Sequence, residues 1–127
     1  MNMKTWLQAI VASALSAGGA LAGSTCSFDT VCRDGQPCAA AKLEIVFRAG
    51  IGGPNDIELD VGDEVVAVAV GGNARVAHLA GLSQTAFHVL TLANGSGAAR
   101  YTRHDDGGPV ATDWIGTCEV GRKSARR

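Results

Sequence analysis

The sequence predicts an all-β protein, a small antiparallel sandwich or barrel of about seven strands that is stapled by disulfide bonds. Apolar residues alternate with period two along much of the chain, which is the pattern of half-buried strands. Clusters of glycine, asparagine, aspartate and proline separate these stretches at short intervals, as turns do in all-β domains. Four cysteines follow an N-terminal segment that is typical of exported proteins, in which disulfides form.

Residues 1–22 have the pattern of a cleaved secretory signal peptide. Lys4 supplies the positive charge, residues 6–15 are nearly all apolar, and residues 20–22 give the small-x-small pattern before a cut at Gly23. The apolar core of about ten residues is shorter than the roughly 20 that a membrane-spanning helix needs, although a retained N-terminal anchor is the alternative. We therefore expect a periplasmic or secreted protein with no membrane span after cleavage.

The four cysteines are expected to form two disulfides, because an even number in an exported chain indicates a disulfide framework. They are Cys26, Cys32, Cys38 and Cys118. Their spacing differs from the close pairs of zinc sites and of thioredoxin-like centres, so we expect no metal and no cofactor. Three pairings are compatible with the sequence. We expect one of the first three cysteines to bridge to the last one, and the other two to pair locally.

Residues 23–41 are expected to be a cysteine-rich coil, and residues 42–118 to form the antiparallel β domain. The alternation is clearest at Ile57–Val61, where the apolar side chains should be buried and the intervening carboxylates exposed. The stretch Arg75–Leu82 is alanine-rich enough to form a short helix instead of a strand. The expected strands cover 43–48, 57–61, 65–70, 74–79, 87–92, 98–103 and 110–115, with the most secure hairpin turn at 94–97.

Charge is distributed unevenly along the chain. Four of the eleven basic residues lie in the last six positions, so residues 119–127 form a basic tail that we expect to be disordered. Without the signal and these four basic residues, six basic residues remain against all twelve acidic ones, which excludes a nucleic-acid-binding body. The carboxylates of Asp56, Glu58 and Asp60 are candidates for binding a basic protein. The tail is a candidate for adhesion to the envelope surface.

Sequence motifs for catalysis are weak. The histidines His78, His88 and His104 could meet across a sheet to hold a metal. The stronger interpretation is that they are unrelated histidines at strand ends or on a solvated face. Neither Ser83 nor Ser96 lies in a nucleophile elbow or a comparable motif. We therefore expect a non-enzymatic protein with no catalytic residues.

Part of the sequence resembles a group of small exported Gram-negative bacterial β-proteins of unknown function. The resemblance lies in Leu90-Thr91-Leu92, in Gly97-Ala98-Ala99-Arg100-Tyr101-Thr102 with His104 two positions later, and in Gly116-Thr117-Cys118. It implies a secreted β-protein that begins with a spaced cysteine cluster. It implies no activity.

The segment Ser96-Gly97-Ala98-Ala99-Arg100-Tyr101 is similar to the S-G-x-x-Y motif of the MliC-type periplasmic inhibitors of C-type lysozyme, with the tyrosine one residue later. That resemblance implies a small antiparallel barrel with a disulfide, in which Ser96 and Tyr101 contact the partner. The sequence as a whole thus predicts a binding or envelope component, and the alternative is an inhibitor of a C-type lysozyme or a similar basic protein.

Overall fold

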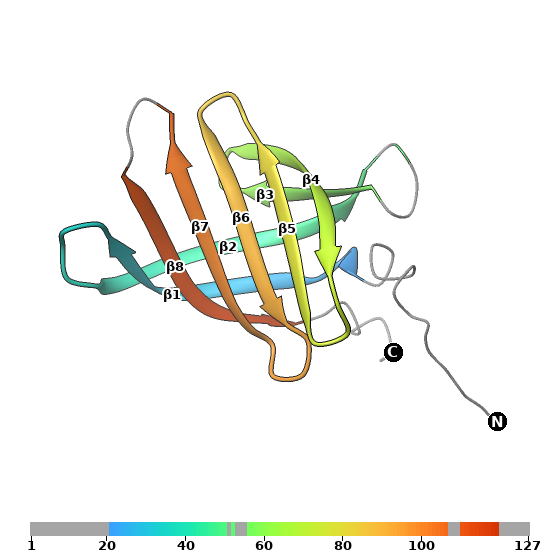
Figure 1. Ribbon diagram of the computed structural model, residues 1–127, viewed down its shortest axis with the longest axis horizontal. Helices are drawn as coiled ribbons and strands as arrows, with labels where there is room; N and C mark the ends of the chain where they lie inside the picture. The colour runs from blue at the N-terminus through green and yellow to red at the C-terminus, as the bar shows by residue number, and fades with distance from the viewer. Residues whose placement is uncertain (1–20, 51, 53–55, 107–109, 120–127) are drawn as a thin grey trace.

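The computed structural model describes residues 21–50, 52, 56–106 and 110–119, which form a closed barrel of eight antiparallel strands (Figure 1). Each strand pairs with the next one along the chain, and the last pairs with the first. The all-β, disulfide-stapled prediction is confirmed, with eight strands where about seven were expected. The strands are β1 (Thr25–Arg33), β2 (Ala39–Ala49), β3 (Ile57–Val61), β4 (Glu64–Gly72), β5 (Val76–Leu82), β6 (Ala86–Ala93), β7 (Ala98–Asp105) and β8 (Ala111–Glu119).

The expected coil at residues 23–41 is wrong, because β1 and the start of β2 lie there. The register of β1 shifts between Phe28 and Thr30 against both of its neighbours, as at a β-bulge. After the shift Val31, not Thr30, lies opposite Trp114. Relative to β8, the extra residue on β1 is Asp29, which reverses the phase of the alternation, so uninterrupted period-two patterns do not reveal this strand.

The alternative of a short helix at Arg75–Leu82 is also wrong. Val76–Leu82 forms β5, which pairs with β4 on one side and with β6 on the other. Most of the expected signal peptide and of the basic tail, residues 1–20 and 120–127, lies outside the described residues. In the part of the chain that is described, no helix is long and apolar enough to cross a membrane.

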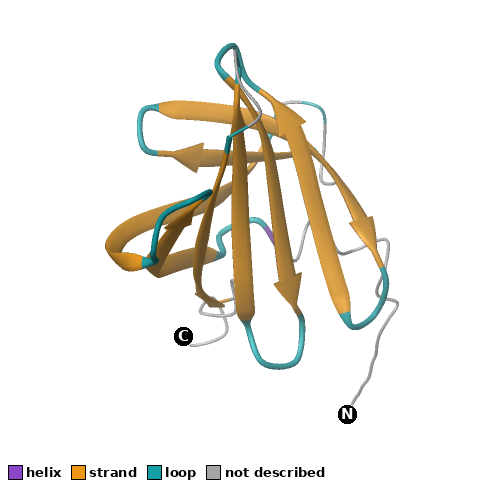
Figure 2. Cartoon of the chain, turned by 60° about the vertical axis from the view of Figure 1, so that its left-hand side comes forward, coloured by secondary structure: helices purple, strands orange, loops and turns teal. Residues whose placement is uncertain are grey.

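The barrel interior is filled by apolar side chains that alternate along the strands, as is usual for eight strands. Figure 2 shows the strands of the barrel and the turns that join them. The strand β3 follows the expected pattern, with Ile57 and Leu59 fully buried and the acidic residues between them partly exposed. The largest fully buried side chains also include two polar ones, Tyr101 and His88. These two lie where the apolar core meets a polar end of the barrel.

Two disulfides fasten the barrel. Cys26 and Cys118 lie opposite one another on β1 and β8 and are bonded across the strand pair that closes the barrel. Cys32 and Cys38 close the β1–β2 hairpin. This confirms the expectation of one long-range bridge to the last cysteine and one local bridge. Close by, Gly116 permits the approach of the bulged strand, since a Cβ atom there would overlap the backbone of Ser27.

Candidate functional site

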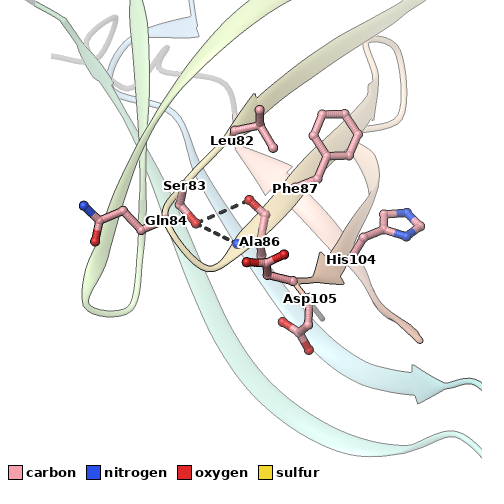
Figure 3. Close-up of a pocket in the computed structure, with 8 residues that line it drawn as sticks. Leu82, Ser83, Gln84, Ala86, Phe87, His104 and Asp105 are labelled. Carbon is pink, nitrogen blue, oxygen red and sulfur yellow. Dashed lines mark hydrogen bonds between the residues drawn. The ribbon is translucent and has the colours of Figure 1, made fainter. Parts of the chain in front are cut away.

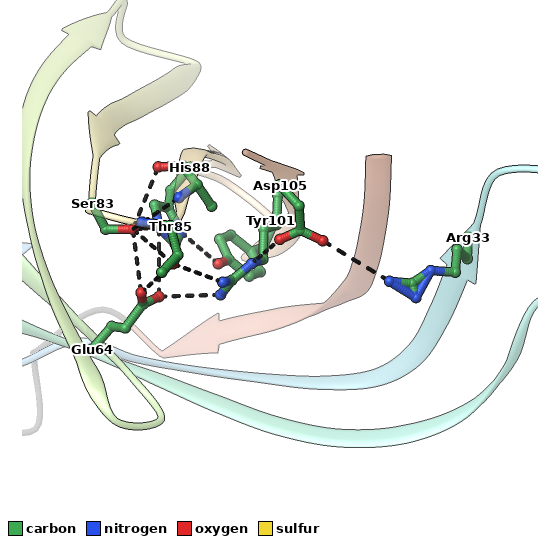
Figure 4. Close-up of polar contacts among 9 residues, drawn as sticks. Arg33, Glu64, Ser83, Thr85, His88, Tyr101 and Asp105 are labelled. Atoms are coloured by element: carbon green, nitrogen blue, oxygen red, sulfur yellow. Dashed lines mark hydrogen bonds and ion pairs between the residues drawn. The ribbon is translucent and has the colours of Figure 1, made fainter. Parts of the chain in front are cut away.

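One end of the barrel is lined on its inner side by polar and charged side chains, which we call the mouth network (Figure 4). Its members come from β1, β4, β6, β7 and the β5–β6 turn, which the closed topology brings to the same end. They are Arg33, Glu64, Ser83, Thr85, His88, Tyr101, Arg103 and Asp105.

Arg103 is the centre of the charged part of this network. Its Nη1 atom lies 3.1 Å from Glu64 Oε1, its Nε atom donates to Asp105 Oδ1 at 2.7 Å, and its Nη2 atom donates to Thr85 Oγ1 at 3.0 Å. Thr85 in turn donates to Glu64 Oε2 at 2.6 Å. On the far side, Arg33 Nη2 lies 4.0 Å from Asp105 Oδ2. Two arginines therefore face two carboxylates, and the charges in the mouth balance.

His88 connects this charged part to the apolar core. Its Nδ1 atom lies 2.7 Å from the Tyr101 hydroxyl, and its Nε2 atom lies 2.9 Å from Ser83 Oγ. Ser83 also donates to the Glu64 carboxylate at 3.3 Å, which can only accept. The hydrogen-bond count therefore assigns the His88 proton to Nε2, so that Ser83 accepts it and Tyr101 donates to Nδ1. In the opposite tautomer, the buried phenol proton would have no acceptor among the described contacts.

The ionisation of the network follows from burial and from these contacts. Burial is the main cause that lowers the pKa of His88, and it raises the pKa of Tyr101 to about 12. The imidazole and the phenol are therefore both neutral at pH 7. The hydrogen bond from Thr85 is the main cause that lowers the pKa of Glu64, and the hydrogen bond from Arg103 is the main cause that lowers the pKa of Asp105. Both carboxylates are ionised at pH 7.

This arrangement is not that of a catalytic triad. In a triad, the second ring nitrogen of the histidine bonds a carboxylate, which orients the ring and stabilises its charged form. Here that nitrogen bonds the Tyr101 hydroxyl, and the Glu64 carboxylate lies 3.7 Å from the same Nε2 atom that faces the serine. The network is arranged to hold neutral and paired groups in place.

A cleft of about 400 Å³ lies beside the mouth network, where the β5–β6 turn meets the end of β7 (Figure 3). Leu82 and Phe87 lie together at one end of it, and Asp105 lies toward the other. Leu82 is 73% exposed and Phe87 40% exposed. The full lining consists of Leu82, Ser83, Gln84, Ala86, Phe87, His104, Asp105 and Asp106.

The structure does not bring Ser96 and Tyr101 together on one surface. Ser96 is exposed in the β6–β7 turn, at the end of the barrel opposite the mouth, where its hydroxyl accepts the Ala98 N–H at 3.1 Å. Tyr101 points inward and is fully buried. Its side chain is therefore not accessible to a partner on the outside of the folded barrel, which corrects its expected role as a partner-binding residue.

The acidic residues of β3 lie on the outer face of the barrel, but a cation partly neutralises them. Arg48 on β2 lies 3.3 Å from Asp60 and 3.8 Å from Glu58. The Asp56 carboxylate accepts the backbone N–H of Gly52 at 2.7 Å. Each of the three carboxylates thus has a partner within the protein.

The three histidines do not converge. His88 faces the interior, His78 is exposed and lies 3.3 Å from the Thr91 hydroxyl, and His104 packs its ring against Phe87. No cluster of three or more metal-ligating side chains suited to a metal ion occurs among the described residues.

The sequence patterns did not indicate the roles of Glu64, Thr85, Arg103 and Asp105. A signal for part of the network was present, because a hairpin turn at 94–97 places His88 directly opposite Arg103. Tyr101 precedes Arg103 by two positions on β7, so its side chain lies on the same face as those of Arg103 and His88. Comparison with known proteins gives no match, since no family model, no curated protein and no solved structure corresponds to this chain.

Proposed function

We propose that this chain is a small exported, non-enzymatic protein that binds a partner at the cleft beside the barrel mouth. The observation that carries the proposal is a contrast between two neighbouring groups of side chains. Those that could do chemistry are bonded to one another inside the mouth, whereas Leu82 and Phe87 are left exposed at the edge of a cleft. Exposed apolar side chains that gather beside a hollow are typical of binding surfaces.

Two further features support export. Both cysteine pairs are bonded, and structural disulfides persist mainly in exported proteins. The N-terminal segment has the pattern of a signal peptide, so the intact mass of protein taken from the periplasm should correspond to a chain that begins at Gly23. A membrane-embedded, unprocessed chain as the main species would contradict this part of the proposal.

The binding role is tested by capture from an envelope extract with the whole protein as bait. The double substitution Leu82→Ser and Phe87→Ser should abolish capture of a specific partner. Val65→Ser is the matched control, because Val65 is also about half exposed but lies on β4 away from the cleft lining. All variants should unfold at similar temperatures. A partner that the double variant still retains would place the binding surface elsewhere.

The non-enzymatic part of the proposal concerns Ser83. A fluorophosphonate probe reacts with serines that a histidine activates as nucleophiles. We expect no labelling, because the histidine beside Ser83 is oriented by a neutral phenol and the Ser83 hydroxyl is bonded to Glu64. Labelling that Ser83→Ala removes would overturn the assignment.

A C-type lysozyme is the specific basic partner that the sequence resemblance suggests, and the outward-facing carboxylates of β3 favour it. With Tyr101 buried, this role would have to use Ser96 and the exposed carboxylates. Inhibition of cell-wall lysis by a C-type lysozyme, lost on Ser96→Ala, would support this second candidate. Lysis at an unchanged rate in the presence of excess protein would eliminate it.

A further inference from the structure

The chemistry of the cleft lining indicates what kind of group it binds, on the basis of the proposed binding role. Its two ends differ in character. Leu82 and Phe87 provide an apolar wall, and the ring of Phe87 packs at an angle against that of His104, with 6.3 Å between their centroids. A ligand at this end must offer aliphatic or aromatic surface.

The other end of the cleft is acidic. Asp105 and Asp106 both line it, whereas no lysine or arginine does. One oxygen of Asp105 is bonded to Arg103 and the other lies 4.0 Å from Arg33, so the charge of Asp105 is already balanced. Asp106 is exposed, and its carboxylate has no ion pair in the part of the chain that the structure describes. The available negative charge of the cleft therefore lies mainly on Asp106.

We propose that the cleft receives a lysine side chain from a basic peptide or protein. The aliphatic stem would lie along Phe87 and Leu82, and the ammonium group would reach Asp106. Lysine combines an apolar stem with a charged tip in the same order as the two ends of the cleft. A hollow of about 400 Å³ is near the lower limit for ligand sites, which suits one side chain rather than a folded segment.

The charge of the whole body supports the same class of partner. Without the expected signal and the four basic residues at the end of the chain, twelve acidic residues face six basic ones, so the body attracts cationic molecules before contact. This long-range attraction does not depend on the cleft. A test must therefore separate local binding from general attraction, and the sequence offers a suitable control in Asp63, an exposed carboxylate in the β3–β4 turn.

The probe is a short peptide of alternating lysine and glycine, with its ends blocked, titrated into the whole protein at physiological salt. Amide chemical shifts of residues 82–87 and 104–106 should move and report the dissociation constant. Asp106→Asn should weaken binding by about three- to fivefold, which is the scale of one exposed ion pair. Asp63→Asn changes the net charge equally and should change the constant by less than about twofold.

A second arm tests the apolar end of the cleft. The same peptide with acetylated lysines keeps its stems and loses its charges, and it should bind at least about threefold more weakly. Phe87→Ala should weaken the binding of both peptides, because it removes the wall that contacts the stem. Equal effects of Asp106→Asn and Asp63→Asn would overturn the proposal in favour of diffuse attraction, and equal binding of the acetylated peptide would show a purely apolar groove.

Failure here can be distinguished from failure of the proposed binding role. If the lysine peptide does not shift the cleft residues but Leu82→Ser with Phe87→Ser still abolishes capture of the envelope partner, the cleft binds a ligand of another class and only the lysine assignment falls. If neither peptide binding nor capture depends on the cleft, both proposals are wrong.

Discussion

The Nδ1 atom of His88 lies 2.7 Å from the hydroxyl oxygen of Tyr101, and neither side chain is exposed to solvent. The rings lie almost parallel, with an angle of 12° between their planes and 5.9 Å between their centroids. This contact joins two strands, β6 and β7, at the level where the apolar interior gives way to the charged mouth. A buried polar pair of this kind stabilises the fold only while both partners are present.

Removing the phenol hydroxyl should therefore be costly. Tyr101→Phe keeps the ring in the core but leaves His88 Nδ1 buried without a donor, which should lower the free energy of unfolding by about 1–3 kcal/mol. Urea denaturation followed by tryptophan fluorescence measures this change, since Trp114 packs against Tyr101. An unchanged midpoint would show that the hydroxyl contributes nothing to stability.

Acid should destabilise the barrel in two steps. Burial lowers the pKa of His88 below its ordinary 6.5, so the unfolded chain takes up this proton first and stability falls as the pH drops below about 6.5. The Thr85 hydrogen bond lowers the pKa of Glu64, so its contribution is present above the ordinary 4.5 and is lost as the pH falls below that value.

Urea unfolding measured between pH 7.5 and pH 3.5 checks both steps. His88→Gln cannot take up a proton and should remove the upper step while leaving the lower one. Stability that stays constant between pH 7 and pH 5 in the unmodified protein would contradict the neutral state assigned to His88.

The two disulfides should contribute different amounts to the free energy of unfolding. The Cys26–Cys118 bridge spans 92 positions and the Cys32–Cys38 bridge spans 6, and the longer loop restricts the unfolded chain more. Replacing both members of the long bridge by serine should cost about 4 kcal/mol, and replacing both members of the short one about 2 kcal/mol. Calorimetry of the two double variants gives the comparison. A larger loss from the short bridge would mean that the chain-entropy argument fails for this barrel.

Substitutions on the inner face of β3 should destabilise the protein much more than substitutions on its outer face. Leu59 is fully buried, so Leu59→Ala should cost about 2–5 kcal/mol by leaving a cavity. Glu58→Gln and Asp60→Asn remove only the partly exposed contacts with Arg48 and should each cost less than about 0.5 kcal/mol. Chemical denaturation measures the three variants, and the order of their stability losses would be reversed if the strand faced the other way.

Gly116→Ala should be far more disruptive than a surface change to alanine. The added Cβ atom would overlap the Ser27 carbonyl where bulged β1 meets β8, so the closing strand pair must separate locally. Gly71→Ala on β4 is the matched control, because no atom lies within 4 Å of a Cβ atom there. Similar melting temperatures for the two variants would show that the bulge adapts without cost.

Much of the fold could be predicted from the sequence, because most strands keep a strict alternation between turns. Turn length also fixes register, and the hairpin at 94–97 alone was enough to place His88 opposite Arg103. The first strand could not be recognised in this way. Its bulge at Asp29 breaks the alternation, and its interior positions include a cysteine and later polar residues.

The rest of the site depends on barrel closure, which no local pattern encodes. Glu64 and Arg103 are 39 residues apart in the sequence. The Glu64 side chain contacts the β5–β6 turn, although the described pairing of β4 with β5 covers only Ala69–Gly72 and Ala77–Ala80. That meeting is set by how the strands tilt around the barrel. The exposure of Leu82, by contrast, follows from local alternation, because Leu82 lies three positions after the buried Leu79 and therefore on the outer face of β5.

Because β1 pairs with β8, the barrel can close only after the last strand of the chain has been made available. If the chain is exported from its amino end as proposed, Cys32 and Cys38 would emerge early, while Cys26 would wait for a partner 92 positions later. During that interval three thiols would be present, any two of which could join. Correct assembly then requires either that the short hairpin forms first or that a wrong bond is reshuffled once the final strand emerges.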